Sequence, residues 1–412
     1  MMKLRKTLYY ILCLLVGVYT LSGCIEEFEA DIPDEDSGLL VVEGTICSGK
    51  QNKFTLSLTQ ALNSANTDFA VDGKAQTYTP QRVMGAKVSV HGNDGSEYMA
   101  TQGTDGYYSC WIDALAPDVE YYLHIEINGE VYESEPQKPL RTEAIADISG
   151  VQDTPESSID VLITPDAPFE PDQTNYYSWT YDETWEVHSD YSTNMYFDTE
   201  TMMRMYQNNL FPEVGWRDAT GSTIMVGAST NYDGQHIQRL KLYGIDRSDE
   251  RVYHMYSGQI YQRAISKAEY EYELARYQAS SEMGGLFTPQ PSTLPTNIHC
   301  LTSNKRVIGF VGCSLNTSER RFFLKARDFS IYRPLREDSR LWIDPCSEEI
   351  CSQMVNKGMY LCAWEDNRIS LGTLKTAWAY DFQLDVRFKG AYIERPDFWP
   401  QEENDDESNE DE

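Results

Sequence analysis

The chain has 412 residues and a formal net charge of −31 at pH 7, with 65 acidic side chains against 34 basic ones. This balance excludes a broad basic surface for nucleic acid or anionic lipid, because both attract patches of Lys and Arg. Aromatic residues form 12 % of the chain and include 28 tyrosines, which together with Ser/Thr-rich alternating segments favours a β-rich protein. The length allows two domains of ordinary size.

The N-terminus has the layout of a secretory signal. A short basic segment precedes an apolar run from Leu8 through Val18, as in signal peptides. The next motif, Leu21-Ser22-Gly23-Cys24, resembles the lipobox of bacterial lipoproteins. The resemblance implies that residues 1–23 are removed and that Cys24 carries acyl chains such as palmitate. The alternative is an N-terminal transmembrane helix, but the run is shorter than the ~20 residues that a bilayer requires.

Residues 24–38 form an acidic tether in this interpretation. Glu26 and Glu27 lie two and three positions beyond the cysteine, a placement that looks like the export tag of lipoproteins of the phylum Bacteroidota that face the cell exterior. An ordinary solvated tether is the alternative. At the other end of the chain, residues 401–412 are almost entirely polar and strongly acidic, which predicts a disordered tail.

Residues 39–138 predict an immunoglobulin- or fibronectin-like β-sandwich. Apolar residues alternate with polar ones in one short segment after another, and Asn93-Asp94-Gly95 predicts a tight hairpin turn. Leu115 and Pro117 precede a strand that begins at Tyr121, an order that resembles the tyrosine corner of these sandwiches. Another kind of β-sandwich or an open barrel is the alternative.

Two prolines near residue 140 place a domain boundary there, so residues 139–400 are predicted to form a larger β-rich domain. Within it, Tyr177, Trp179 and Tyr181 alternate along one face of a long strand. Such a ladder can serve as an aromatic platform for sugars or peptides. Aromatic residues at this spacing more often belong to the core, and the core is the favoured interpretation.

One helix is predicted near residues 267–281. Ser266 and Glu269 have the spacing of a capping box, in which each side chain satisfies a free backbone donor of the other. Good helix formers follow, and a pair of glycines ends the helix. Tyr270, Leu274 and Tyr277 share one face, which we expect to pack on the sheet.

The segment after this helix is rich in proline from Phe287 to Asn297. Proline disfavours both helix and central strand, so this segment is expected to run over the surface. Leu286, Phe287 and Leu294 are then possible apolar anchors of an interaction loop. The alternative is that they fold back and cover the helix.

No catalytic or metal-binding motif accompanies these elements. The six histidines are scattered singly, and no phosphate loop, nucleophile elbow or paired metal spacing occurs. The sequence therefore predicts no enzyme, no metal and no cofactor, with an exported hydrolase built from distant carboxylates as the weaker alternative.

The cysteines leave their pairing open. Export permits disulfides, but an odd number of cysteines beyond the signal and Cys24 cannot pair completely. We expect buried thiols or one or two disulfides, with Cys346–Cys351 or Cys351–Cys362 closest in sequence. The set is Cys47, Cys110, Cys300, Cys313, Cys346, Cys351 and Cys362.

The order of several motifs resembles a known family. The tyrosine-rich helix, Gly285-Leu286-Phe287-Thr288-Pro289, Val307-Ile308-Gly309-Phe310-Val311 and Arg395-Pro396-Asp397-Phe398-Trp399 follow one another as in a Bacteroidota lipoprotein family catalogued as a domain of unknown function. The resemblance runs from Val42 to Trp399. It implies an outer-membrane location and genes beside TonB-dependent receptors, and it implies no reaction.

We therefore expect a surface-exposed, non-enzymatic lipoprotein that assists a TonB-dependent transporter in nutrient capture. A structural or adhesive cell-surface subunit is the alternative. Members of the family carry two close cysteines late in the chain, and the additional Cys362 leaves a late disulfide open here.

Overall fold

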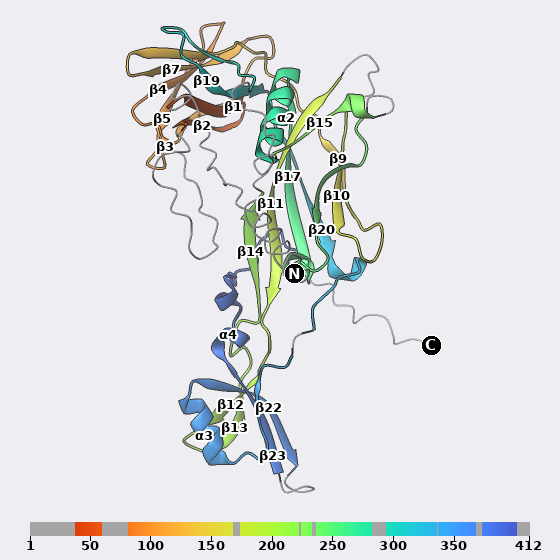
Figure 1. Ribbon diagram of the computed structural model, residues 1–412. Helices are drawn as coiled ribbons and strands as arrows, with labels where there is room; N and C mark the ends of the chain where they lie inside the picture. Colours follow the sequence, from red (N-terminus) through yellow and green to blue (C-terminus); the bar gives the residue numbers. More distant parts are fainter. Residues whose placement is uncertain are drawn as a thin grey trace, which may run out of the picture.

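The computed structural model describes residues 38–59, 81–167, 174–221, 224–232, 236–281, 294–335, 337–367 and 373–401. Strands dominate this part of the chain and few helices accompany them, so the predicted mainly β fold is confirmed. Three hydrophobic cores occur among the described residues, each in its own lobe (Figure 1). Two lobes are sandwich-like, and the third is a small lobe at the far end of the molecule.

The first sandwich is one path of strands that folds back on itself. The order is β18-β8-β7-β4-β5-β6-β2-β1-β19, with β3 beside β2. Its strands are β1 (Leu40–Cys47), β2 (Lys50–Leu58), β3 (Gln81–Arg82), β4 (Lys87–Gly92), β5 (Glu97–Gln102), β6 (Tyr108–Ile112), β7 (Tyr121–Ile127), β8 (Glu130–Ser134), β18 (Ile298–Cys300) and β19 (Val307–Ser314). Alternate apolar residues of these strands meet in its core.

Two strands from far along the chain complete this sandwich. β18 pairs antiparallel with β8, and β19 runs parallel to β1 from Leu40↔Val307 to Cys47↔Ser314. The sequence analysis places the sandwich within residues 39–138, so residues 298–314 are an addition that only the structure shows. A parallel neighbour requires a crossover connection, and here every strand of the second sandwich except β20 lies within that connection.

Two local features that the sequence predicts for the first sandwich, a hairpin turn and a tyrosine corner, are confirmed. Gly95, in the predicted hairpin between β4 and β5, has a φ of 87°. The Tyr121 hydroxyl accepts a hydrogen bond from the backbone N–H of Ala116 at 2.9 Å, which is the expected tyrosine-corner contact. In β19, Gly309 has a φ of +119°, and a Cβ there would lie 1.9 Å from the carbonyl oxygen of Val42. Glycine therefore permits β19 to approach β1.

The second sandwich packs a three-stranded sheet, β16-β10-β9, on a five-stranded sheet in which β14, β11, β17 and β20 are neighbours and β15 pairs with β11. The bounds are β9 (Ile145–Val151), β10 (Ile159–Pro165), β11 (Tyr176–His188), β14 (Val214–Thr220), β15 (Met225–Ala228), β16 (Leu240–Ile245), β17 (Met255–Ile265) and β20 (Ser318–Lys325). Tyr177 and Trp179 are almost completely buried in this core.

The small third lobe combines a hairpin, a three-stranded sheet and a helix. Its elements are β12 (Met195–Asp198), β13 (Met203–Tyr206), β21 (Leu341–Ile343), α3 (Glu348–Asn356), β22 (Met359–Asn367), β23 (Thr373–Tyr380) and α4 (Asp381–Leu384). The sequence analysis does not predict α3, which Ser347 caps by accepting a hydrogen bond from the N–H of Ile350. Residues 139–400 thus contain two cores where one domain is predicted.

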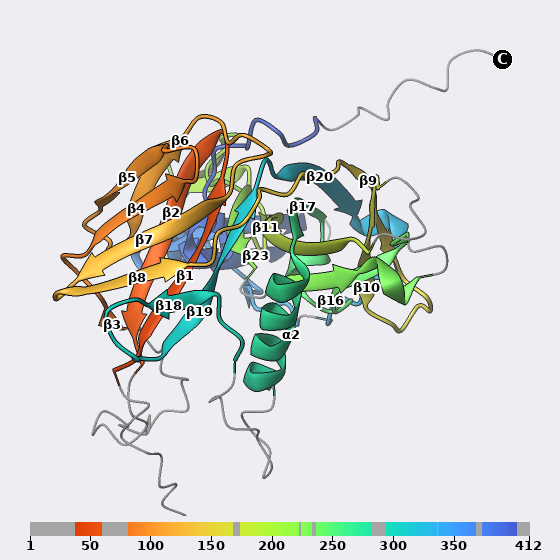
Figure 2. The ribbon, with the colours of Figure 1, turned by 90° about the horizontal axis from the view of Figure 1, so that it is seen from above.

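Helix α2 (Lys267–Ser281) lies between the two sandwiches (Figures 1 and 2), and its predicted position is confirmed. The predicted packing face is confirmed only in part, since Tyr270 is half-buried with its ring 5.1 Å from that of Tyr176 of β11. Tyr277 is 55 % exposed, whereas Tyr272 is buried and its ring lies 5.6 Å from that of Phe310. The buried face is therefore turned toward the positions of Glu269 and Tyr272. No helix among the described residues is long and apolar enough to span a bilayer.

The predicted capping box forms only in part. Ser266 Oγ accepts a hydrogen bond from the Glu269 N–H at 3.1 Å. The Glu269 carboxylate turns away from the helix terminus and forms a buried ion pair with Arg263 of β17. A Cβ on Gly312 of β19 would lie 2.6 Å from Glu269 Oε1, so the first sandwich packs directly against this pair.

Candidate functional site

A large cavity lies where one end of the five-stranded sheet meets the C-terminal segment. The last residues of β11 and β20 and the first residues of β14 and β17 converge there, because neighbouring strands of this sheet are antiparallel. The cavity has a volume of ≈ 1200 Å³. Its lining consists of Glu186, His188, Val214, Trp216, Tyr253, His254, Met255, Lys325, Ala326, Arg327, Phe329, Ile331, Arg333, Arg395, Trp399, Pro400 and Gln401.

Strand geometry places the polar residues of this cavity. Glu186 and His188 are two positions apart on β11, so their side chains leave the same face of the sheet. Glu186 lies opposite Trp216 of β14, and Met255, at the start of β17, lies opposite Lys325 of β20. His254 directly precedes β17, so it lies at the same end of the sheet as His188.

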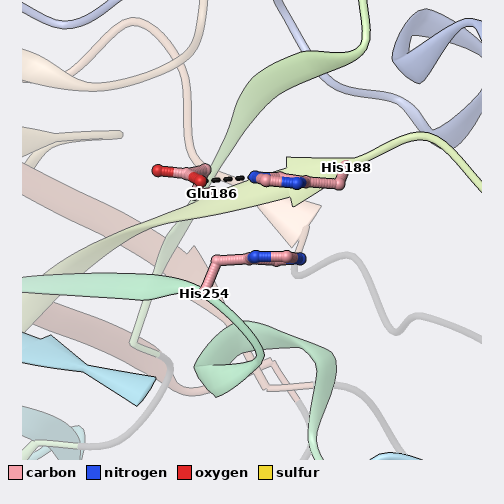
Figure 3. A group of neighbouring side chains, drawn as sticks. All are labelled: Glu186, His188 and His254. Carbon is pink, nitrogen blue, oxygen red and sulfur yellow. Dashed lines mark hydrogen bonds and ion pairs between the residues drawn. The ribbon is translucent and has the colours of Figure 1, made fainter. Parts of the chain in front are cut away.

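Glu186, His188 and His254 form a compact cluster (Figure 3). Glu186 Oε1 lies 2.5 Å from His188 Nε2. The rings of His188 and His254 are stacked, with their centroids 3.5 Å apart and an interplanar angle of 11°. The carboxylate therefore contacts one imidazole, which in turn covers the face of the other.

This environment moves the pKa of two of the three groups. Burial lowers the pKa of His254 to about 4, and the charges of His188 and Arg333 act in the same direction, whereas Glu186 opposes them. Burial by itself would raise the pKa of Glu186, but the hydrogen bond and charge of His188, together with the charge of His254, outweigh it and lower that pKa. At neutral pH the cluster thus holds a carboxylate beside a neutral His254.

The cluster does not fit a metal ion, although its three ligand atoms lie within 4.8 Å of one another. Imidazole lone pairs point outward in the plane of the ring, and the two rings here lie in nearly parallel, separate planes. An ion at the usual distance of about 2.0–2.1 Å from a nitrogen of each ring would lie far outside both planes. Stacking and metal binding exclude each other in this arrangement.

The cavity is basic although the chain is acidic. Four of its described lining residues are Lys or Arg, and one, Glu186, is acidic, whereas the chain has 65 acidic and 34 basic side chains. None of the described lining residues is Ser, Thr or Cys.

An adjoining cavity of ≈ 830 Å³ shares Glu186, His188, Tyr253, His254 and Arg333 with the first. Its own basic residues are neutralised by ion pairs. Arg217 pairs with Glu250 at 2.5 Å, and Lys389 pairs with Asp190 at 2.7 Å. Apart from the shared Arg333, the basic residues without a carboxylate partner therefore line only the larger of these two cavities.

The structure does not bring the sequence-predicted site residues together. Cys24, Glu26, Glu27, Leu286 and Phe287 lie outside the described residues. Leu294 is half-buried and lines a separate pocket of ≈ 350 Å³ beside β18 and β19.

The aromatic platform is a wrong prediction. Tyr177 and Trp179 are 1 % and 0 % exposed, and Tyr181 is half-buried with its ring stacked on Tyr243 at 4.3 Å. A ligand cannot stack on these faces because core side chains already cover them. The favoured interpretation of the ladder as core residues is correct.

The seven described cysteines carry free thiols. Cys346 and Cys351 are both buried in the third lobe with their sulfur atoms 3.4 Å apart, and Cys362 lies apart from them, half-buried. Burial raises the pKa of Cys110 and Cys362 to about 11. These two thiols are therefore poor nucleophiles at neutral pH.

Sequence reasoning missed the cavity. His188 and His254 are far apart in the chain and belong to no paired motif. The one available signal is the Glu-x-His spacing on a strand, which is common by chance. The basic residues of the lining come from residues 325–333 and from Arg395. The sequence indicates Arg395 and Trp399 only through the family resemblance.

Of the comparisons with known proteins, only the one with protein families is informative. No curated protein matches the chain. Among solved structures, the chain is similar to a DUF4785 family protein from Legionella pneumophila subsp. pneumophila, with 9 % sequence identity and a TM-score of 0.16. The match covers 55 % of this chain and spans 51 % of that protein, and such a low TM-score carries no argument.

The family comparison is more extensive. The family model described as "Domain of unknown function (DUF4249)" matches residues 25–320. This stretch is more than half of the chain and contains α2, the first sandwich and the second sandwich up to the start of β20. The protein is therefore a member of the DUF4249 family.

Proposed function

We propose that the protein is a lipid-anchored lipoprotein on the outer surface of the outer membrane, where it captures a nutrient ligand for a TonB-dependent transporter without catalysing a reaction. The observation that carries the capture role is the cavity of ≈ 1200 Å³, which is lined by aromatic and basic side chains. Binding sites of proteins are typically concave, with apolar walls and a few convergent polar groups.

The membrane location is supported by the sequence. The lipobox-like motif ends at Cys24, and the acidic residues Glu26 and Glu27 follow it. Acyl chains contribute about 0.8 kcal/mol per buried methylene, so a multiply acylated cysteine anchors a large domain without a membrane-spanning helix. The tether then separates the sandwiches from the bilayer, where a transporter can reach them.

The anchor and the partner are tested together by cell fractionation and purification in mild detergent. The wild-type protein should be found in the outer-membrane fraction and should co-purify with a TonB-dependent transporter, identified by mass spectrometry. The Cys24→Ala variant should lose the lipid and leave the membrane fraction. A Cys24→Ala variant that is processed and retained at the wild-type level would refute the anchor, and a wild-type preparation without a transporter would refute the partner.

A further inference from the structure

We propose that the large cavity binds a polyanionic small molecule, whose carboxylate or phosphate oxygens contact its basic lining. This inference rests on the proposed capture role and deepens it, because it states the chemical class of the ligand. It is carried by three observations: uncompensated positive charge, an indole donor without an acceptor, and the contrast with the adjoining cavity.

The first observation is the state of the basic residues. Lys325, Arg333 and Arg395 form no ion pair with any described carboxylate. The guanidinium groups of Arg333 and Arg395 instead donate to the backbone carbonyl oxygens of Tyr253 and Pro400. A carbonyl holds a guanidinium in position and leaves its positive charge uncompensated, so both remain able to attract an anion.

The acidic residue in the lining does not neutralise them. Glu186 is paired with His188 at 2.5 Å, and its side chain is 16 % exposed. This one carboxylate, already engaged by the imidazole, is outnumbered by the four cationic side chains of the lining. The electrostatic character of the cavity is set by Lys and Arg, with aromatic and aliphatic side chains around them, and a low-dielectric wall strengthens the field of such charges.

The second observation is the indole of Trp216. This residue lines the cavity and is 8 % exposed, and its Nε1 is a buried donor without a hydrogen-bond partner among the described residues. Leaving a buried donor unsatisfied is unfavourable. An acceptor oxygen that reached this one donor would satisfy it, and an anionic ligand would supply acceptors to the basic side chains as well.

The third observation is the contrast with the adjoining cavity. There each basic residue outside the shared set has a carboxylate partner, as in Arg217–Glu250 and Lys389–Asp190. Lys325, Arg333 and Arg395 of the larger cavity have no such partner among the described residues. The volume of ≈ 1200 Å³ leaves room for a ligand with more than one anionic group.

Isothermal titration calorimetry on the mature protein in mild detergent tests the proposal with three probes. Citrate represents polycarboxylates, tripolyphosphate represents polyphosphates, and raffinose is a neutral control of comparable size. We expect citrate or tripolyphosphate to bind and raffinose not to bind. Binding of citrate alone identifies a carboxylate ligand, and binding of tripolyphosphate alone identifies a phosphate ligand.

Variants locate the bound anion. Lys325→Gln and Arg333→Gln should each weaken binding by about 10-fold or more, as expected for the loss of a charge-assisted hydrogen bond. Lys87→Gln removes an exposed cation of the first sandwich and should leave the affinity unchanged. Circular dichroism verifies that each variant is folded.

The proposal is overturned if neither anion binds, if raffinose binds equally well, or if the two cavity variants bind like Lys87→Gln. These outcomes do not depend on the membrane anchor or on the transporter. Failure of anion binding with retained transporter co-purification therefore rejects the ligand class and leaves the proposed function standing.

Discussion

The side chains around His254 determine the pKa of its imidazole. His188 covers one face of its ring at a centroid distance of 3.5 Å, and Arg333 and Lys389 add positive charge nearby. Burial and like charge both disfavour the imidazolium form. The pKa of His254 is accordingly about 4, below its ordinary value of 6.5, despite the opposing charge of Glu186.

This lowered pKa predicts a pH-dependent stability. Between pH 6.5 and pH 4 the unfolded chain binds more protons at His254 than the folded chain does, so its contribution to stability is lost as the pH falls through that window. His254→Phe keeps an aromatic ring for stacking and removes the titration. Thermal denaturation from pH 7 to pH 4 should show a shallower decline of Tm for this variant, and identical slopes would contradict the prediction.

Single residues differ in how far the sequence predicts their roles. The alternation of Tyr177 and Trp179 predicts that they share a face, and burial follows because that face covers a core. His188 and His254 meet only because β11 and β17 are paired, and a pairing register cannot be obtained from a strand's own residues. The same limit applies to Arg333 and Arg395, which reach the cavity from irregular segments.

At the scale of elements, α2 shows how tertiary contacts override a local pattern. Its N-terminus is correctly predicted from Ser266, because capping depends on neighbouring residues alone. The packing face is predicted only in part: Tyr270 packs on Tyr176 of β11, but the polar residue Glu269 is also buried, with 4 % exposure, against Arg263 of β17. An apolar-face argument cannot anticipate a helix that packs through an ion pair.

The Arg263–Glu269 pair gives a prediction for α2. Arg263 Nη1 donates to Glu269 Oε2 at 3.0 Å, and both side chains are largely buried. Glu269→Gln removes the charge that compensates Arg263, and it should reduce the free energy of unfolding by about 3–5 kcal/mol. Urea denaturation measures the effect.

Glu271→Gln provides the matched control on the same helix. Glu271 forms an exposed pair with Lys267 at 3.5 Å, and such pairs contribute about 0.3–0.5 kcal/mol. The Arg263→Met/Glu269→Leu double variant should recover part of the loss, because no unpaired charge stays buried. Equal effects of Glu269→Gln and Glu271→Gln would show that the buried pair has no special role.

At the scale of the whole molecule, the sequence predicts the β-rich class and the sandwich-like start of the chain but not the division into lobes. The core of the third lobe contains Phe197 together with residues such as Cys346 and Trp378. Contacts between residues so far apart in the chain produce no periodic pattern in the sequence. The large cavity is likewise a product of assembly, since its lining comes from strands of the second sandwich and from the C-terminal segment.

The late strands of the first sandwich give a prediction about fragments. Residues 38–140 lack β18 and β19, so one edge of β1 and one edge of β8 would be left unpaired. This fragment should show no cooperative thermal transition by circular dichroism. Appending residues 294–316 through a long flexible linker should restore one. A cooperative transition of the shorter fragment alone would contradict the prediction.

The parallel pairing of β1 with β19 also sets the order in which an exported chain can fold. Residues leave a secretion channel from the N-terminus onward, so Leu40 emerges long before its partner Val307. The first sandwich cannot close until β9 to β17 of the second have followed, and closure of such a long loop slows folding. In the exported protein that we propose, the unpaired edge of β1 would therefore stay exposed during export and would be a site for a periplasmic chaperone.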